Sequence, residues 1–367
     1  MDISAKTSSL IKFTVVLVSL SIIIAILYIG QNIFIPLVLA LLFAIILSPV
    51  ASFLNLKLRF THGLAAIVSV ILFFAVITVV VLLISWQISD MTNDWIQIKK
   101  NLLIHYESAQ HWVKNKYNLS YNKQDNYMQQ VAQKSMNGDS QFMGNTLSSF
   151  TDTALSIVLI PIYCFLILLY RNLFITFLYQ MVRYKNEDIL VEVLSKIKSV
   201  IKSYIVGIFI EMGIVGILTT SGFLILGIHY AILLGAITAL LNLIPYIGIL
   251  VAGSIAIFAT LGNSTDVYLI LGIIIVNIVV QFIDNNIIVP KIVGNKVSIN
   301  SLVTMIGVII GGSLWGIPGM ILSIPIMAII KIIFDNIESL KPWGALLGNI
   351  IPANSKKSIL TKLKIIK

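Results

Sequence analysis

The sequence predicts an all-α fold, a polytopic bundle of transmembrane helices with six to eight spans. Of its 367 residues, 58% are hydrophobic and only 11% are charged. A soluble domain is nearer to roughly 45–50% apolar and about 25% charged. The charged residues are also grouped, and the uncharged blocks between them are long enough to cross a hydrocarbon core of about 30 Å. We therefore expect an integral membrane protein in contact with membrane lipid.

The N-terminal segment, residues 1–89, predicts three spans. No charged residue lies between Lys12 and Lys57. One helix over that interval would be about 66 Å long at about 1.5 Å per residue, so the chain must turn. The stretch "YIGQNIFIP" contains Gly30 and Pro36, which favour a turn. The predicted spans are near 12–30, 33–54 and 60–89.

Residues 90–149 predict a helical arm outside the membrane. The segment is rich in Asn, Gln, Ser, Lys and Asp. A connecting loop is the alternative, but a loop has no reason to keep apolar side chains at helical spacing over five turns. A polar stretch near 118–145 is expected to follow the helix. The apolar face comprises Trp95, Ile98, Leu102, Tyr106, Ala109 and Val113.

Residues 150–203 predict a fourth span near 151–170 and an amphipathic helix over 186–202. Asn186 can cap this helix, and Glu187 suits its first turn. Apolar and basic residues fall on opposite faces, which is typical of a helix lying on the cytoplasmic membrane surface. We expect it to lead into the next span.

Residues 204–335 predict a transport core with two broken segments. A fifth span fits 204–227 and another fits 267–283, whereas 231–260 fits either a sixth span or a re-entrant hairpin. The apolar block at 301–330 is interrupted by several glycines and prolines. Segments interrupted in this way are a sequence signal for a transport site. A basic tail, 336–367, follows.

The distribution of lysines predicts that both termini lie in the cytoplasm, in a multi-pass protein of the cell (cytoplasmic) membrane. Two topologies satisfy this rule. Eight spans place 284–300 outside the cell, whereas six spans with two re-entrant hairpins place it inside. The net charge of +10 reflects these lysines. No nucleic-acid partner is expected, because no aromatic-plus-basic pattern accompanies them.

Candidate site residues come from polar groups inside apolar segments. Glu211 is the one acid well within a span, where a carboxylate is costly and usually faces a protein-lined interior. Asp284 stands at the predicted end of a span, where a solvated helix terminus is the plain alternative. Both are candidates for ion or proton coupling. Candidates for the substrate path are Asn242, Pro245, Gly248, Asn285, Asn286, Pro290, Gly294, Gly311, Gly312, Gly316 and Gly319, although the glycines could simply pack helices.

The sequence offers no catalytic or metal motif. It lacks His-Glu-x-x-His, Gly-x-Ser-x-Gly, Gly-x-Gly-x-x-Gly and the phosphate-binding Gly-x4-Gly-Lys-Ser/Thr pattern. His105 and His111 are poorly spaced for one metal, and Cys164 is the single cysteine. We expect no enzyme activity, no metal and no cofactor other than coupling ions such as protons or sodium.

Three motifs resemble the autoinducer-2 exporter family of bacterial and archaeal membrane proteins. They are "NLIPYIG" (242–248), "DNNIIVPKIVG" (284–294) and "GGSLWGIPGMILSIP" (311–325), in that order. The resemblance covers the C-terminal half, whereas the N-terminal half fits in layout only. The family pattern often has His-Pro where this chain has Ile299 and Asn300.

The resemblance implies a secondary transporter that forms a homo-oligomer, with a pentamer as one expected state. Some relatives are linked to export of the quorum-sensing signal autoinducer-2, others to exchange of sodium or lithium for protons. The expected cargo is therefore a small polar solute or a monovalent cation, because a family alone does not fix the substrate. The alternative is a membrane scaffold or accessory subunit without transport activity of its own.

Overall fold

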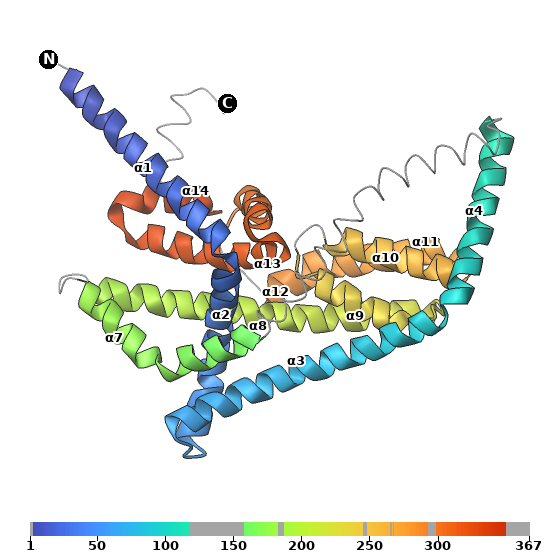
Figure 1. Cartoon of the computed structure of the whole chain (residues 1–367), viewed down its shortest axis with the longest axis horizontal. Helices are drawn as coiled ribbons and strands as arrows, with labels where there is room; N and C mark the ends of the chain where they lie inside the picture. The colour runs from blue at the N-terminus through green and yellow to red at the C-terminus, as the bar shows by residue number, and fades with distance from the viewer. Residues whose placement is uncertain are drawn as a thin grey trace. The chain divides into compact units, whose positions relative to one another are not determined.

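The computed structural model describes residues 3–117, 158–182, 187–244, 248–264, 266, 268–292 and 299–349. Every named element within these ranges is a helix (Figure 1), which confirms the predicted all-α fold. The helices pack into two compact units. Unit 1 comprises Met1–Ile67, Ala154–Lys198 and Ser298–Lys367, and unit 2 comprises Val68–Thr153 and Ser199–Val297.

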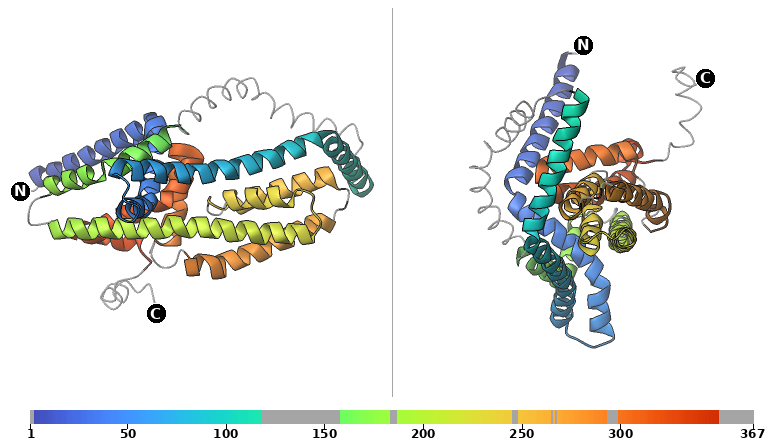
Figure 2. Two further views of the ribbon diagram at one scale, coloured as in Figure 1. Left: turned by 90° about the horizontal axis from the view of Figure 1, so that it is seen from below. Right: turned by 90° about the vertical axis from the view of Figure 1, so that its right-hand side faces the viewer.

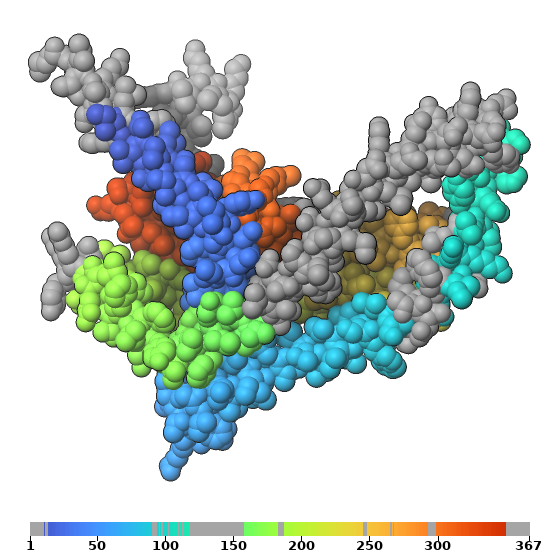
Figure 3. Space-filling model, viewed as in Figure 1, coloured from blue at the N-terminus to red at the C-terminus, as the bar shows by residue number. Residues whose placement is uncertain are grey.

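Within the described residues, five helices are long and apolar enough to cross a membrane, or six if a bent pair counts as one span. The bent pair is Val158–Leu169 and Arg171–Met181, which meet at 65°. Long apolar helices are expected to face lipid, and α3 (His62–Asn93) does expose such surface (Figure 3), with Val76 64% exposed. The multi-pass helical architecture therefore agrees with the sequence, and the count of five or six reaches only the lower limit of the predicted six to eight. The five helices are Gln31–Leu56, His62–Ser89, Glu187–Ile225, Tyr268–Ile292 and Ser301–Asn336.

The first turn is shorter than predicted. Helix α1 (Ile3–Ile29) gives way to α2 (Gln31–Leu56) at Gly30 alone. Pro36 lies inside α2 and is buried, so it contributes packing there instead of the turn. A proline inside a helix removes one backbone donor, and α2 continues past it.

Helix α4 (Trp95–Tyr117) confirms that the segment after α3 is helical. It is not a free arm, because Ile98 is buried and packs where Gly262 of unit 2 would otherwise carry a side chain. Asn101 Nδ2 donates to the Gly262 carbonyl at 3.0 Å. The predicted polar stretch near 118–145 lies outside the described residues.

The amphipathic helix and the fifth span are one element. Helix α8 (Glu187–Ile225) runs for 39 residues, preceded by α7 (Arg171–Met181). No proline interrupts it, and it ends just before Gly227, whose φ is +72°. The predicted cap, Asn186, lies outside the described residues.

Unit 2 contains the first helical hairpin. Helices α9 (Ala231–Leu241) and α10 (Gly248–Asn263) pack side by side, and Figure 2 shows them with α11 beside the C-terminal half of α8. At about 1.5 Å per residue, neither helix reaches the roughly 30 Å needed to cross a hydrocarbon core. The geometry therefore favours a re-entrant hairpin over a straight sixth span in this segment.

Helix continues beyond α11 (Tyr268–Ile283) as far as Ile292, so the prediction that a span ends at residue 283 was wrong. A π-helical segment, η2 (Asp284–Ile288), and α12 (Val289–Ile292) continue the same helix. The Val289 N–H donates to the Asp284 carbonyl, five residues back. This wider turn inserts one residue and lets the helix continue up to and through Pro290.

Unit 1 contains the second helical hairpin, within α13 (Ser301–Asn336). In a straight helix Gly307 and Met327 would be about 30 Å apart. In the structure a Cβ on Gly307 would collide with the Met327 side chain. The helix therefore folds back at Trp315 and Gly316, both of which have non-helical backbone angles, and α13 is long without running straight.

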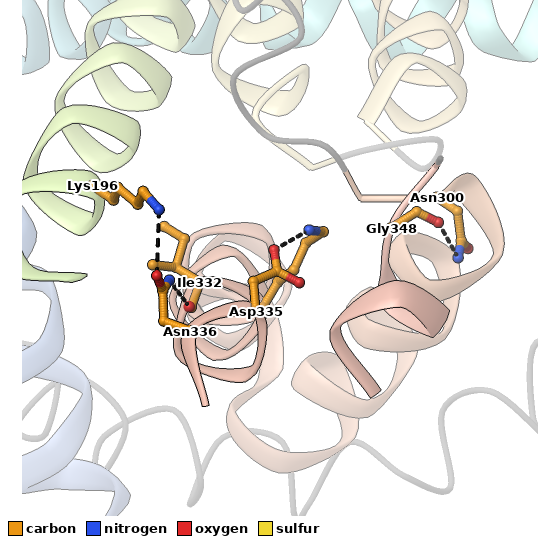
Figure 4. A network of polar contacts seen from close by, with 7 residues as sticks. Lys196, Asn300, Ile332, Asp335, Asn336 and Gly348 are labelled. Atoms are coloured by element: carbon orange, nitrogen blue, oxygen red, sulfur yellow. Dashed lines mark hydrogen bonds and ion pairs between the residues drawn. The ribbon is translucent and has the colours of Figure 1, made fainter. Parts of the chain in front are cut away.

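The first part of the predicted tail packs onto α13 through η4 (Glu338–Leu340) and α14 (Lys341–Leu347). Figure 4 shows the polar contacts of this region. Asn300 Nδ2 donates to the Gly348 carbonyl, and Lys196 Nζ donates to Asn336 Oδ1 at 3.3 Å. The division of the chain into five segments stays a prediction, and residues 350–367 lie outside the description.

Candidate functional site

Three of the predicted site residues meet in unit 2. Glu211 lies midway along α8, Asn242 follows the last residue of α9, and Asp284 opens η2. Asn242 Nδ2 donates to Glu211 Oε1 at 3.1 Å and to Asp284 Oδ2 at 3.3 Å. One amide group therefore joins two carboxylates from two other helices. We call these three residues the carboxylate cluster.

The break in the first hairpin places Asn242. Its backbone N–H still donates to the Thr238 carbonyl, so it forms the C-terminal cap of α9. Gly248 starts α10 so close to this end that a Cβ would collide with the Leu241 carbonyl. A glycine is required for this approach, and it brings the start of α10 beside Asn242.

The π-helical segment places Asp284. Its side chain is only 3% exposed, whereas the next two residues are exposed. Beside it in unit 2 lies an apolar cluster of Val215, Val280 and Ile288. π-Helical turns are rare and occur often at functional sites, where they redirect side chains.

The two acids of the carboxylate cluster lack a cationic side chain to pair with them among the described residues. Among the described residues, no Lys, Arg or His forms an ion pair with Glu211 or Asp284. Asp284 Oδ1 is buried and has no hydrogen-bond partner. A buried carboxylate is stable only when it is paired, protonated or bound to a cation. The arrangement can therefore bind a proton or a small cation between two acids.

Other predicted residues lie elsewhere. Asn285 Oδ1 accepts from Gln281 Nε2 at 3.0 Å, and Asn286 Nδ2 donates to the Phe282 carbonyl at 2.8 Å. Both asparagines are exposed and neither contacts the carboxylates, and Pro290 is also exposed. Pro245 and Gly294 fall outside the described residues. Gly311, Gly312, Gly316 and Gly319 belong to the second hairpin, in unit 1.

Sequence reasoning missed two buried groups. Tyr204 precedes Glu211 by seven residues, so two helical turns place both on one face of α8, and it is buried. The spacing of seven was a signal that could have found it. Trp315 Nε1 donates to the Leu27 carbonyl at 2.9 Å, within unit 1. No sequence pattern pointed to that contact, because 288 residues separate the two partners.

Comparison with known proteins identifies the family. The model of the AI-2E family transporter matches residues 17–339. "Putative transport protein YueF" of Bacillus subtilis is 25% identical over 84% of this chain and 85% of its own length. "Putative permease PerM" of Escherichia coli is 27% identical over 48% of this chain and 50% of its own. "Putative transport protein YrrI" of Bacillus subtilis is 33% identical over 35% of this chain and 36% of its own. The chain therefore belongs to the AI-2E transporter family, a family of multi-pass membrane transport proteins.

Proposed function

We propose that this protein is a secondary transporter whose coupling ion, a proton or a sodium ion, binds at the carboxylate cluster. The observation that carries the proposal is the pair of hydrogen bonds from Asn242 to Glu211 and Asp284. Two acids that share one amide leave negative charge uncompensated in an apolar surrounding. Acids in such positions commonly mark ion or proton pathways.

The geometry supports exchange of sodium or lithium for protons best. A carboxylate pair can hold one monovalent cation through its oxygens, or it can be neutralised by protons instead. Hard cations prefer oxygen ligands, and the cluster offers four carboxylate oxygens, two of which accept from Asn242 Nδ2. Because one site serves both ions, binding of one displaces the other, which is the requirement for exchange.

Export of a small polar solute, such as the autoinducer-2 signal after which the family is described, is the second version of the same proposal. In that version the cluster binds the coupling ion while the solute crosses by a separate path. The discriminating feature is the response to a sodium pulse. Exchange predicts that sodium collapses an imposed pH gradient, whereas solute export predicts no such collapse.

The test is flux in proteoliposomes that contain purified protein and a pH-sensitive dye. Glu211→Gln and Asp284→Asn remove the charges with little change in shape, and each is expected to lower sodium-driven proton flux by at least about tenfold, or ~1.4 kcal/mol. Glu192→Gln is the matched control, because Glu192 lies on the same helix, is 57% exposed and, among the described residues, pairs only with Lys196. The control should retain wild-type flux.

Unchanged flux in both cluster variants would contradict the assignment of the carboxylate cluster as the ion-binding site. The scaffold alternative predicts no flux from the purified wild-type protein with any tested solute, together with a partner that co-purifies. We also propose a homo-oligomer in the cell membrane with both termini in the cytoplasm. Cross-linking in native membranes and protease access to terminal tags would test these two points.

A further inference from the structure

A cavity opens at the end of unit 2 away from the carboxylate cluster. Its volume is about 430 Å³, and Asp94, Tyr230 and Thr260 are among its lining residues. Tyr230 Oη donates to Asp94 Oδ2 at 2.6 Å. Tyr230 immediately precedes α9 and Asn242 immediately follows it, so one helix of the first hairpin separates the cavity from the cluster.

Among the described residues of unit 2, four buried side-chain oxygens have no hydrogen-bond partner. They are Thr219 Oγ1, Thr260 Oγ1, Asn277 Oδ1 and Asp284 Oδ1. Thr219 is 0% exposed and Thr260 is 4% exposed. A buried polar atom without a partner is unfavourable by roughly 1–3 kcal/mol, so four in one helical unit require an explanation.

Close contacts between the helices place some of these oxygens at the same height along the helix axes. A Cβ on Gly222 of α8 would lie 2.7 Å from Val276 of α11, which places Thr219 at the level of Asn277. A Cβ on Gly253 of α10 would lie 3.3 Å from Asn277 Nδ2. Polar side chains therefore lie at one height between α8, α10 and α11 in the middle of unit 2.

The spacing along the helices is regular. Thr219 is eight residues from Glu211, and Asn277 is seven from Asp284, a rise of about 10–12 Å. Thr260 is seven residues beyond Gly253, about 10 Å further in the direction of the cavity, which it lines. Thr219, Asn277 and Thr260 are called the oxygen file below.

We propose that the oxygen file conducts a small monovalent cation, sodium or lithium, between the cavity at Asp94 and the carboxylate cluster. This inference rests on the proposed function, and it adds the route by which the cation reaches the carboxylate cluster. All four unpartnered atoms are oxygens that can accept or coordinate, and hard cations take such ligands. Neutral hydroxyl and amide oxygens bind a cation weakly enough to release it, whereas the carboxylates at the end hold it.

The test is uptake of radioactive sodium into proteoliposomes by variants that remove one oxygen without changing shape. Thr219→Val and Thr260→Val are expected to lower the initial rate at least fivefold, and Thr219→Ser should restore it. Thr238→Val is the matched control. Thr238 is similarly buried in unit 2, but its hydroxyl donates to the Leu234 carbonyl at 2.7 Å, so it is not one of the unpartnered groups.

Loss of uptake in the two file variants, with the control near wild type, supports the route. Equal rates in all three valine variants would overturn it, and the coupling role of Glu211 would stand if Glu211→Gln still abolished flux. Absence of sodium uptake by the wild-type protein would overturn the route and the sodium–proton exchange version of the proposed function. A fold check by thermal unfolding of each variant in detergent separates lost conduction from lost structure.

Discussion

The two hairpins both reverse the direction of an apolar helical segment, but different residues form the turn. In the first, α9 and α10 meet at a polar residue, and Asn242 at the break bonds two carboxylates. In the second, α13 turns at Trp315 and Gly316, and its two arms touch through backbone, since Gly311 and Gly319 leave no room for a Cβ. Both were predicted from the same signal, an apolar segment interrupted by glycine and proline.

The difference shows that an interrupted helix need not be a binding site. The break in the first hairpin brings an amide group against two carboxylates from two other helices. The break in the second brings the backbones of the two arms into contact, and the polar group at this break bonds to backbone. Trp315, for example, donates to the carbonyl of Leu27 near the end of α1. We therefore expect substitutions in the second hairpin to change stability first, and substitutions in the first to change transport first.

The largest effect is expected from Gly319→Ala. The new Cβ would collide with the Gly311 carbonyl, and a backbone atom of a packed helix cannot move aside as a side chain can. Overpacking of this kind destabilises by typically 1–3 kcal/mol, and we expect about 3 here. Thermal unfolding in detergent measures the loss.

Gly213→Ala on α8 is the control for that substitution. Nothing lies within 4 Å of the Cβ position at Gly213, and the residue is helical, so alanine should stabilise by up to about 1 kcal/mol. If Gly319→Ala were as stable as Gly213→Ala, the close approach of the two arms would be wrong.

A second effect is expected from Asn242→Leu. Leucine has nearly the same size but cannot donate to Glu211 or Asp284, so the two carboxylates lose their shared partner. We expect sodium-driven proton flux to fall at least about tenfold, ~1.4 kcal/mol, with a smaller loss of stability than Gly319→Ala causes. Flux and thermal unfolding are measured on the same preparations.

Asn285→Leu is the matched control, since Asn285 follows Asp284 directly but its amide bonds only to Gln281 among the described residues. It should keep wild-type flux. Equal loss in both variants would mean that the first hairpin has no special role, and the comparison between the hairpins would fail.

Much of this arrangement was predictable from sequence. Uncharged blocks predicted most of the helices, and the spacing of three to four between apolar residues after Trp95 predicted α4. Glu211, Asn242 and Asp284 were each singled out as polar groups in apolar surroundings. Their meeting was not predictable, because hydrogen bonds across 31 and 42 residues depend on how three helices pack.

The failures have one physical cause. The sequence predicted a turn at Pro36 and the end of a span at residue 283, yet Pro36 lies inside α2 and the helix at residue 283 continues through Pro290. Proline removes one backbone donor, and a helix continues when packing or a π-helical turn offsets that loss. Whether a proline ends a helix therefore depends on tertiary contacts that a single sequence does not contain.

The smallest effect on transport is expected from Asn300→Ala in the second hairpin, which should change stability alone. Asn300 Oδ1 accepts from the Val303 N–H at 2.8 Å and caps α13, while its Nδ2 donates to the Leu346 carbonyl at 2.8 Å. Loss of an N-cap costs about 1 kcal/mol, and loss of the second bond costs about 1 more. Thermal unfolding should therefore show a fall of about 2 kcal/mol.

Asn300→Ser separates the two contributions, because serine can still cap the helix but is too short to reach α14. We expect it to lose about half as much stability as alanine does. Flux per folded protein should stay at the wild-type level in both variants, in contrast to Asn242→Leu. Two asparagines, each at the end of a hairpin helix, would then differ only in what they bind. Asn300 binds backbone and holds the fold, whereas Asn242 binds carboxylates and serves transport. A flux defect in Asn300→Ser at unchanged stability would contradict this division.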